Sequence, residues 1–248
     1  MRPGADVVPV FGTASLQVPQ KRSFVVAQWP VPIVVSRGAL VPFGVFALLF
    51  AAFSRDSRPS VVVAAALLGG VGGVVSLIVH ELGHISISRR LSGVRPEKVA
   101  VMSLGAAAHF QGAYRDGREQ ARMALGGAEA SFAFALSLMI PILLPAPTWL
   151  KVGALALALL NALIGGLSLL PVHPLDGHKF CVGLLWWMFG SEAKARRIIK
   201  RVGVGLLAID GSALVLLLAE KPVLGMTVAG LAAVALGQKR FVGPRPRA

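Results

Sequence analysis

Two histidines four residues apart, with a glutamate beside the first, form a His-Glu-Leu-Gly-His run at 80–84. On a helix, side chains at this spacing project from one face, so His80 and His84 can bind a single divalent metal ion. Glu81 can then reach a water on that ion and accept its proton. The alternative is a polar patch whose hydrogen bonds hold helices together. The run therefore predicts a hydrolytic metal centre that still lacks a third protein ligand.

A candidate third ligand is Asp176, in a Pro-Val-His-Pro-Leu-Asp-Gly run at 171–177. The two prolines bend or break a helix and expose the local backbone. Taken alone, the run also fits an ordinary Asp-Gly turn. However, Asp176 follows an apolar stretch whose end, by the parity of membrane crossings, lies on the same side as His80 and His84. The three residues can therefore meet at similar depth as candidate Zn²⁺ ligands, and the register of this run with the other motif blocks of the chain favours a ligand over a turn.

The composition is that of a membrane protein. Hydrophobic residues make up 55% of the chain and charged residues 15%, against roughly 25% charged residues in a soluble domain. Cys181 is the single cysteine, which excludes an internal disulfide and a multi-cysteine zinc site. The net charge of +14 could suggest nucleic acid, but the basic residues flank apolar runs instead of gathering with aromatic residues. We expect the lipid bilayer as a partner, and no nucleic acid.

Six apolar stretches are long enough, or nearly so, to cross a bilayer as helices. They cover residues 38–53, 60–84, 123–144, 149–170, 202–219 and 222–237. With six crossings, one side of the membrane receives every Lys and Arg except Arg55, Arg58, Lys151 and Lys221. Short cytoplasmic loops are rich in these residues. The sequence therefore predicts an all-α polytopic membrane protein of about six transmembrane helices, in the cell membrane, with both termini and the active site toward the cytoplasm.

Residues 94–120 interrupt this helical pattern. They mix valines with alanines and glycines, which predicts a small membrane-associated strand or hairpin region between the second and third helices. A strand within 99–110 could pair with an extended substrate. We expect one intramembrane domain at 31–237, a cytoplasmic tail at 1–30 with no cleaved signal peptide, and a basic tail at 238–248.

Three blocks of the chain resemble the site-2 protease family of intramembrane zinc metalloproteases. They read H-E-L-G-H at 80–84, L-G-G-A-E-A-S at 125–131 and S-L-L-P-V-H-P-L-D-G at 168–177. The resemblance implies that His80, His84 and Asp176 bind one Zn²⁺ per chain and that Glu81 activates water. It also implies that the substrate is a transmembrane protein, cut within or near the bilayer during regulated intramembrane proteolysis.

The chain departs from the family pattern at Ser168, where the family usually has an asparagine that positions substrate or stabilises the tetrahedral intermediate. The Ser168 hydroxyl can still donate a hydrogen bond. Asn161 lies seven residues earlier on a similar helical face, about 10 Å away along the axis, and could supply an amide. Both are candidate substrate-positioning residues. The competing hypothesis is a non-proteolytic membrane transporter or metal-binding scaffold, against which Glu81 argues because a structural zinc site needs no general base.

The remaining polar residues near these motifs allow more than one interpretation. His173 and His178 flank Asp176 and could be additional ligands, but supporting roles at the interface or behind the ligands are preferred. His109 is expected at the surface of the hairpin region. Glu129 and Asp210 lie in apolar stretches, where either helix packing or a proton or substrate path would explain them. No residue pattern specifies an oligomeric state.

Overall fold

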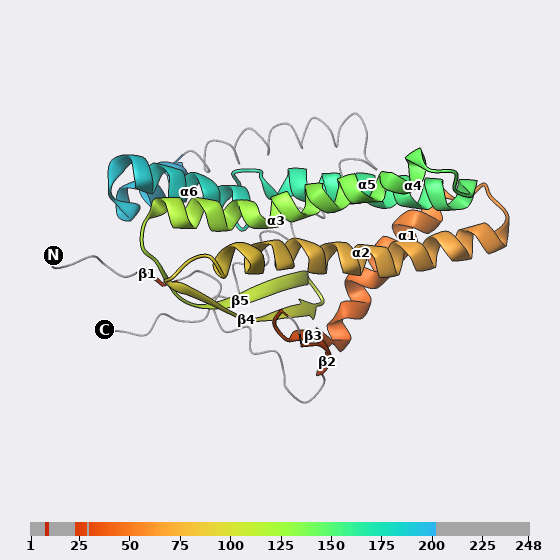
Figure 1. Ribbon diagram of the computed structural model, residues 1–248, viewed down its shortest axis with the longest axis horizontal. Helices are drawn as coiled ribbons and strands as arrows, with labels where there is room; N and C mark the ends of the chain where they lie inside the picture. Colours follow the sequence, from red (N-terminus) through yellow and green to blue (C-terminus); the bar gives the residue numbers. More distant parts are fainter. Residues whose placement is uncertain (1–7, 10–22, 29, 202–248) are drawn as a thin grey trace.

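The computed structural model describes residues 8–9, 23–28 and 30–201, which form a mainly helical fold with one small sheet (Figure 1). The helices are α1 (Leu40–Phe53), α2 (Pro59–Ser88), α3 (Gly117–Leu138), α4 (Ile140–Leu143), α5 (Thr148–Ser168) and α6 (Asp176–Phe189). A 3-10 turn at Arg37–Ala39 precedes α1, and residues 192–201 are also helical. The strands are β1 (Val8–Pro9), β2 (Ser23–Ala27), β3 (Ile33–Ser36), β4 (Val94–Met102) and β5 (Gly105–Tyr114).

Helix α2 lies between two layers of the molecule. Helices α3 and α5 pack along one side of it, and strands β4 and β5 lie against the other (Figure 1). On the sheet side, Ile85 is fully buried in a cluster with Val94, Val99, Phe110 and Met123. Helix α6 packs on α3 at the end of the molecule where α2 meets the sheet. The histidine run on α2 therefore lies where helices and sheet come together.

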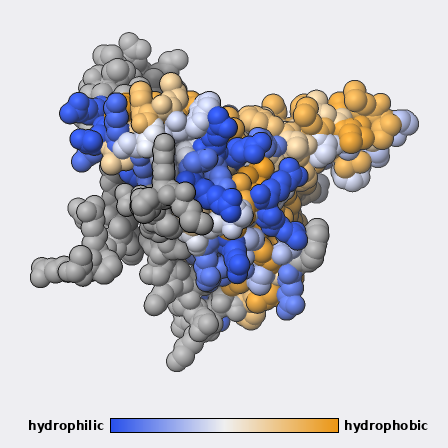
Figure 2. Space-filling model, turned by 60° about the vertical axis from the view of Figure 1, so that its left-hand side comes forward, coloured by the Kyte–Doolittle hydropathy of each residue, from blue (hydrophilic) through white to orange (hydrophobic). Residues whose placement is uncertain are grey.

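Four of the six apolar stretches coincide with helices of the structure. Three helical segments are long and apolar enough to cross a membrane, namely Pro59–Ser88, Gly117–Leu143 and Thr148–Ser168. The first stretch forms the shorter apolar helix Arg37–Phe53. The stretches predicted at 202–219 and 222–237, and the tail at 238–248, lie outside the described residues. Figure 2 shows hydrophobic surface toward the end where the long helices extend away from the sheet, and hydrophilic residues around the opposite end.

The strand region is larger than the predicted hairpin. Strands β4 and β5 form the expected antiparallel pair, but β3 adds to β4 in parallel, with Ile33 opposite Val99, and β2 adds to β3. The sheet order is β1-β5-β4-β3-β2. Parallel strands need a long crossover, and here α1 and α2 provide it. The prediction of an all-α fold was therefore too narrow, and the expected tail at 1–30 contains β2.

Glycines allow α3 to approach two other helices closely. A Cβ atom on Gly83 of α2 would collide with the backbone of Gly126 on α3. Likewise, a Cβ atom on Gly117 of α3 would collide with the carbonyl oxygen of Gly183 on α6. Close backbone approach of this kind is how small residues act at helix interfaces in membranes. Helix α3 thus sets the distance between α2 and α6, which carry the candidate metal ligands.

Candidate metal centre

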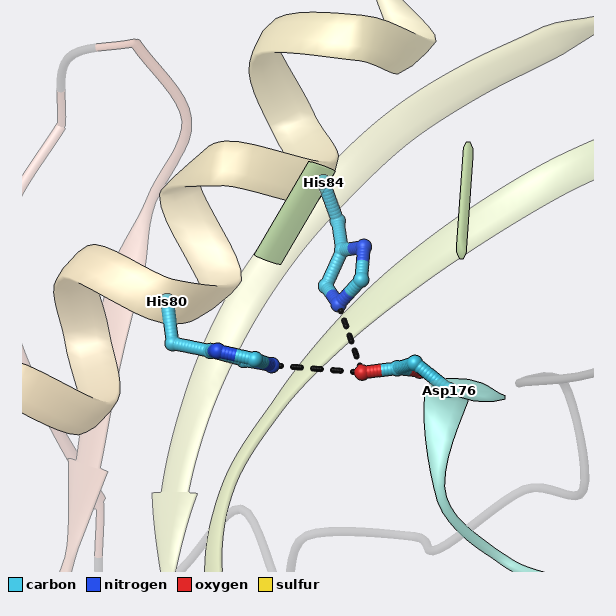
Figure 3. Close-up of side chains that lie close together, drawn as sticks. All are labelled: His80, His84 and Asp176. Atoms are coloured by element: carbon cyan, nitrogen blue, oxygen red, sulfur yellow. Dashed lines mark hydrogen bonds and ion pairs between the residues drawn. The ribbon is translucent and has the colours of Figure 1, made fainter. Parts of the chain in front are cut away.

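The structure brings His80, His84 and Asp176 together at one buried point (Figure 3). Oδ2 of Asp176 lies 3.2 Å from Nε2 of His80 and 3.1 Å from Nε2 of His84. The histidines project from one face of α2, as their spacing predicts, and Asp176 reaches them from the first turn of α6. One ligand atom from each residue lies within 4.8 Å of the other two.

Asp176 reaches this point because the chain folds back sharply between α5 and α6. Helix α5 ends at Ser168, and α6 starts only eight residues later, after Pro171 and Pro174. A Cβ atom on Gly177 would collide with the carbonyl oxygen of Leu169, so a glycine is needed directly after Asp176. Asp176 and Gly177 thus begin α6, with Asp176 at the ligand position and Gly177 in close contact with the end of α5.

The outer nitrogens of both imidazoles have hydrogen-bond partners on α3. Nδ1 of His84 donates to the carbonyl oxygen of Met123 at 2.8 Å, since a carbonyl can only accept. In the neutral ring, this leaves the lone pair on Nε2, the atom that faces Asp176. Nδ1 of His80 lies 3.0 Å from the Ser131 hydroxyl oxygen, which can accept a hydrogen bond from it in the same way. Both rings are thus oriented as metal ligands usually are.

The geometry of the donor atoms fits a zinc ion. Zinc binds nitrogen and oxygen at about 2.0–2.2 Å, so neighbouring ligand atoms of a tetrahedral site are about 3.3–3.6 Å apart. The two distances from Nε2 to Oδ2 are close to this value. Space for an ion is also kept open by Gly127 of α3, where a Cβ atom would collide with Nε2 of both histidines. Three protein ligands leave a fourth position for water or substrate.

Lys179, one helical turn after Asp176, completes the charges around the carboxylate. Its Nζ lies 2.7 Å from Oδ1 of Asp176, the oxygen that does not face the histidines. Burial by itself would raise the pKa of Asp176, but the Lys179 ammonium and the hydrogen bonds of His80 and His84 outweigh it and hold that pKa below its usual range. Asp176 is therefore an ionised ligand at neutral pH.

Glu81 is tied to the sheet instead of to the metal ligands. Its Oε2 accepts a hydrogen bond of 2.7 Å from the backbone N–H of Ala108 on β5. Its charge nevertheless acts at the centre, because burial would lower the pKa of Lys179, whereas Asp176 and, to a smaller extent, Glu81 raise it. Glu81 thus follows His80 on α2 but is not one of the three grouped residues.

The two candidate substrate-positioning residues have other partners. The Ser168 hydroxyl donates to the carbonyl oxygen of Gly165 on its own helix at 2.8 Å. Nδ2 of Asn161 donates to the Ser76 hydroxyl and to the carbonyl oxygen of Leu157, both at 2.8 Å, so it links α5 to α2 one turn before His80. Among the described residues, Oδ1 of Asn161 is buried with no hydrogen-bond partner.

The other histidines stay outside the metal group. His173 and His178 pack edge to face, with ring centroids 5.3 Å apart, and line a neighbouring cavity with Tyr114 and Lys179. His109 is 8% exposed, so the expectation of a surface histidine was wrong. Its ring packs into the sheet, where burial lowers its pKa. Glu129 is exposed on α3, and Asp210 lies outside the part of the chain that the structure describes.

Five groups of the site were not identified from the sequence. Gly127 and Ser131 lie in the second block of the family resemblance, so that block contained the signal for both. Lys179 is one turn from Asp176, at the spacing of a helical ion pair, which was a usable signal. The other two are main-chain atoms, the carbonyl of Met123 and the amide of Ala108, and side-chain patterns carry no information on these.

Comparisons with known proteins agree with this site. No protein-family model matches the chain. The chain is 28% identical over 147 residues to a zinc metalloprotease of Methanocaldococcus jannaschii, an alignment that covers 54% of the chain and 39% of that protein. It is 31% identical over 142 residues, covering 52% of the chain, to Rip3 of Mycobacterium tuberculosis, which is named as a predicted zinc metalloprotease. The chain spans 34% of the length of Rip3.

A solved structure shares the fold. The site-2 protease of Methanocaldococcus jannaschii superposes with a TM-score of 0.56 at 20% sequence identity, over 91% of the chain and 98% of that structure. At this identity the superposition shows a common fold. Together with the similarity to the curated zinc metalloproteases and the grouped His80, His84 and Asp176, it supports the resemblance of the chain to the site-2 protease family.

Proposed function

We propose that the protein is an intramembrane zinc metalloendopeptidase that hydrolyses a peptide bond within or near a transmembrane segment of another membrane protein. One observation carries this proposal: His80, His84 and Asp176 converge on a single buried point, and Glu81 follows His80 on the same helix. A structural zinc site would need the ligands but not the glutamate. We further propose that the reaction serves regulated intramembrane proteolysis.

Each residue of the site has a definite role in such a reaction. His80, His84 and Asp176 hold the ion, and Ser131 and the Met123 carbonyl keep the two rings oriented. When bound, Zn²⁺ supplies a Lewis acid that polarises the scissile carbonyl and acidifies water. Glu81 accepts the proton of the attacking water and passes it to the nitrogen of the leaving amine. The carboxylate must leave the Ala108 amide, or share it, while it carries that proton.

The outer edge of β5 supports binding of an extended substrate. The Ala108 N–H donates to Glu81, so it is not used in the ladder with β4. Strand β1 pairs with β5 only at Ala113 and Tyr114, so in the described residues the edge from Gly105 to Phe110 has no strand partner. A helical peptide bond is shielded by its own hydrogen bonds, and an unwound segment added to this edge would lie beside Glu81.

The membrane orientation that fits this site has its metal centre toward the cytoplasm. The metal ligands lie near the C-terminal end of α2, which is followed by the exposed Arg89 and Arg90. Hydrophilic surface surrounds this end of the molecule in Figure 2. Since Lys and Arg collect on the cytoplasmic side, we place both termini there and the protein in the cell membrane.

Replacing Glu81 tests the proposed reaction. In cells that carry Glu81→Gln, we expect at least one membrane protein to accumulate uncut, because removing a general base costs about 10²–10⁴-fold in rate. The purified variant should still contain about one zinc per chain. Glu129→Gln, which changes an exposed glutamate on α3, is the matched control and should process its substrates normally. A membrane proteome that is the same for Glu81→Gln and wild type would rule out the mechanism.

One observation favours the alternative, a non-proteolytic transporter or metal-binding scaffold. The Ser168 hydroxyl, at the position of the family asparagine, is bonded to its own helix instead of pointing to a substrate. This alternative predicts zinc binding without turnover. In that case the purified protein would bind zinc, and Glu81→Gln would leave every membrane protein unchanged.

A further inference from the structure

The two oxygens of Asp176 face different partners. Oδ2 lies 3.2 and 3.1 Å from the histidine nitrogens, whereas Oδ1 lies 2.7 Å from Nζ of Lys179. A carboxylate can bind a metal ion through one oxygen or through both. Binding through both would use the position that a catalytic zinc keeps for water and substrate. What holds Oδ1 away from the ion therefore matters for the chemistry.

Lys179 is held in place by α3. Nε2 of Gln120, a buried side chain on α3, donates to the carbonyl oxygen of Lys179 at 3.0 Å. Gly117 and Gly183 let the two helices touch at this crossing. Lys179 also lines a cavity of about 110 Å³ together with Tyr114 and Val182. Its side chain is 42% exposed, but its carbonyl oxygen and its Nζ both have partners, Gln120 and Asp176.

An ordinary ion pair on a helix surface would not explain this arrangement. Pairs three residues apart are common on exposed helix faces, and most contribute little. Here the acidic partner is 12% exposed and has its other oxygen on two buried histidines. The charge of Lys179 is therefore applied to a ligand of the metal centre and to one particular atom of that ligand.

We propose that Lys179 is a positioning residue that confines Asp176 to binding the metal through Oδ2 alone and so keeps the fourth position of the centre open. The role presupposes the zinc centre of the proposed function. It requires a cation at this place, since the group must hold a carboxylate oxygen by a charge-assisted hydrogen bond. Arginine should therefore substitute for Lys179, and a neutral side chain should not.

Cobalt is a suitable probe, because the visible spectrum of Co²⁺ distinguishes four ligands from five. The full chain, purified in detergent without metal, is titrated with Co²⁺. We expect wild type to give the intense bands of a four-coordinate ion. Lys179→Met should give the weaker bands of a five-coordinate ion and bind Co²⁺ roughly tenfold more weakly, the size of effect usual for a group behind a ligand. Lys179→Arg should behave like wild type.

Two controls keep the outcome decisive. Lys151→Met changes a lysine at the opposite end of α5 from the site and should leave the spectrum unchanged. Lys179→Gln should behave like Lys179→Met and serves if the methionine variant does not fold. Wild-type spectra and affinities for both neutral variants would overturn the role of Lys179 but leave the proposed protease intact. Failure of the wild type to bind Co²⁺ would overturn the metal centre itself, and the role of Lys179 with it.

Discussion

Gly127 has no side chain, and this leaves room at the candidate metal centre. Its Cα faces the two ligand nitrogens, and any Cβ atom there would collide with both. The same helix supplies Ser131 and the Met123 carbonyl, so α3 forms a wall behind His80 and His84 that orients the rings and leaves room for an ion. The three candidate ligands therefore depend on α3 for the orientation of the imidazole rings and for the space that an ion needs.

Gly127→Ala should therefore weaken metal binding. We expect zinc affinity to fall by about 10–100-fold, the range usual for changes directly behind metal ligands, because the rings must tilt or α3 must move. The measurement is a competition titration of zinc against a chelator. Gly166→Ala is the control, since a Cβ atom there meets nothing within 4 Å. Equal zinc affinity in the two variants would mean that the space beside the nitrogens does not hold the ion.

Among the individual residues of the site, the sequence predicted those whose positions depend on spacing along the chain. The pairing of His80 and His84 was predicted from helical periodicity. Asp176 was predicted from the register of its run with the other motif blocks, and the parity of membrane crossings allowed the three residues to meet. The burial of His109 was not predictable, because it depends on how β4 and β5 pack. The Ser168 hydroxyl donates to the carbonyl oxygen of Gly165 on its own helix, as serines in apolar helices often do. This bond is a local alternative to the predicted contact with substrate.

Strand β5 connects the sheet to the chemistry through a main-chain atom. The N–H of Ala108 holds Glu81, and it belongs to the edge where we propose that substrate pairs. Its register, with Ala108 opposite Val99, is set by the antiparallel pairing with β4. In the proposed reaction, the sheet would position Glu81 and pair with the substrate.

Ala108→Pro removes this N–H with little other change. Proline is tolerated where the N–H is not part of the ladder, so we expect normal zinc content and at least a tenfold loss of substrate processing. Ala108→Ser keeps the N–H and should remain active. Full processing by Ala108→Pro would show that neither Glu81 nor the substrate depends on this amide.

The helices and strands that were predicted are those that a short stretch of sequence specifies by itself. Helices α2 and α5 have long apolar sequences, and the mixture of valines with alanines and glycines in 94–120 predicted the hairpin. The parallel pairing of β3 with β4 joins residues more than sixty positions apart, and no short-range pattern specifies it. For this reason the prediction missed β2 and β3 as parts of the same sheet.

The described part of the molecule has a hydrophobic end and a hydrophilic end (Figure 2). The candidate metal ligands His80 and His84 lie near the C-terminal end of α2, which the exposed Arg89 and Arg90 follow. Exposed apolar side chains on α1, α2 and α5 are those that a bilayer would cover. The predicted membrane orientation assigns α6 and the sheet to the cytoplasmic side.

Thiol labelling of Cys181, the single cysteine of the chain, tests the predicted membrane orientation. Cys181 on α6 is partly exposed, and burial raises the pKa of its thiol, so labelling should be done at alkaline pH. We expect a membrane-impermeant maleimide to label Cys181 in inside-out vesicles and not in intact cells. Ser57→Cys in a Cys181→Ser background places the thiol in the turn between α1 and α2 and should give the opposite result. Labelling of Cys181 from outside would reverse the orientation.

His80, His84 and Asp176 are proposed to form one zinc site. Equilibrium zinc titration of the purified wild type and of Asp176→Ala tests this, with Asp56→Ala in the exposed turn after α1 as the control. We predict one tight site in the wild type and in the control, and at least a hundredfold loss of affinity in Asp176→Ala. Wild-type zinc affinity in Asp176→Ala would contradict the account.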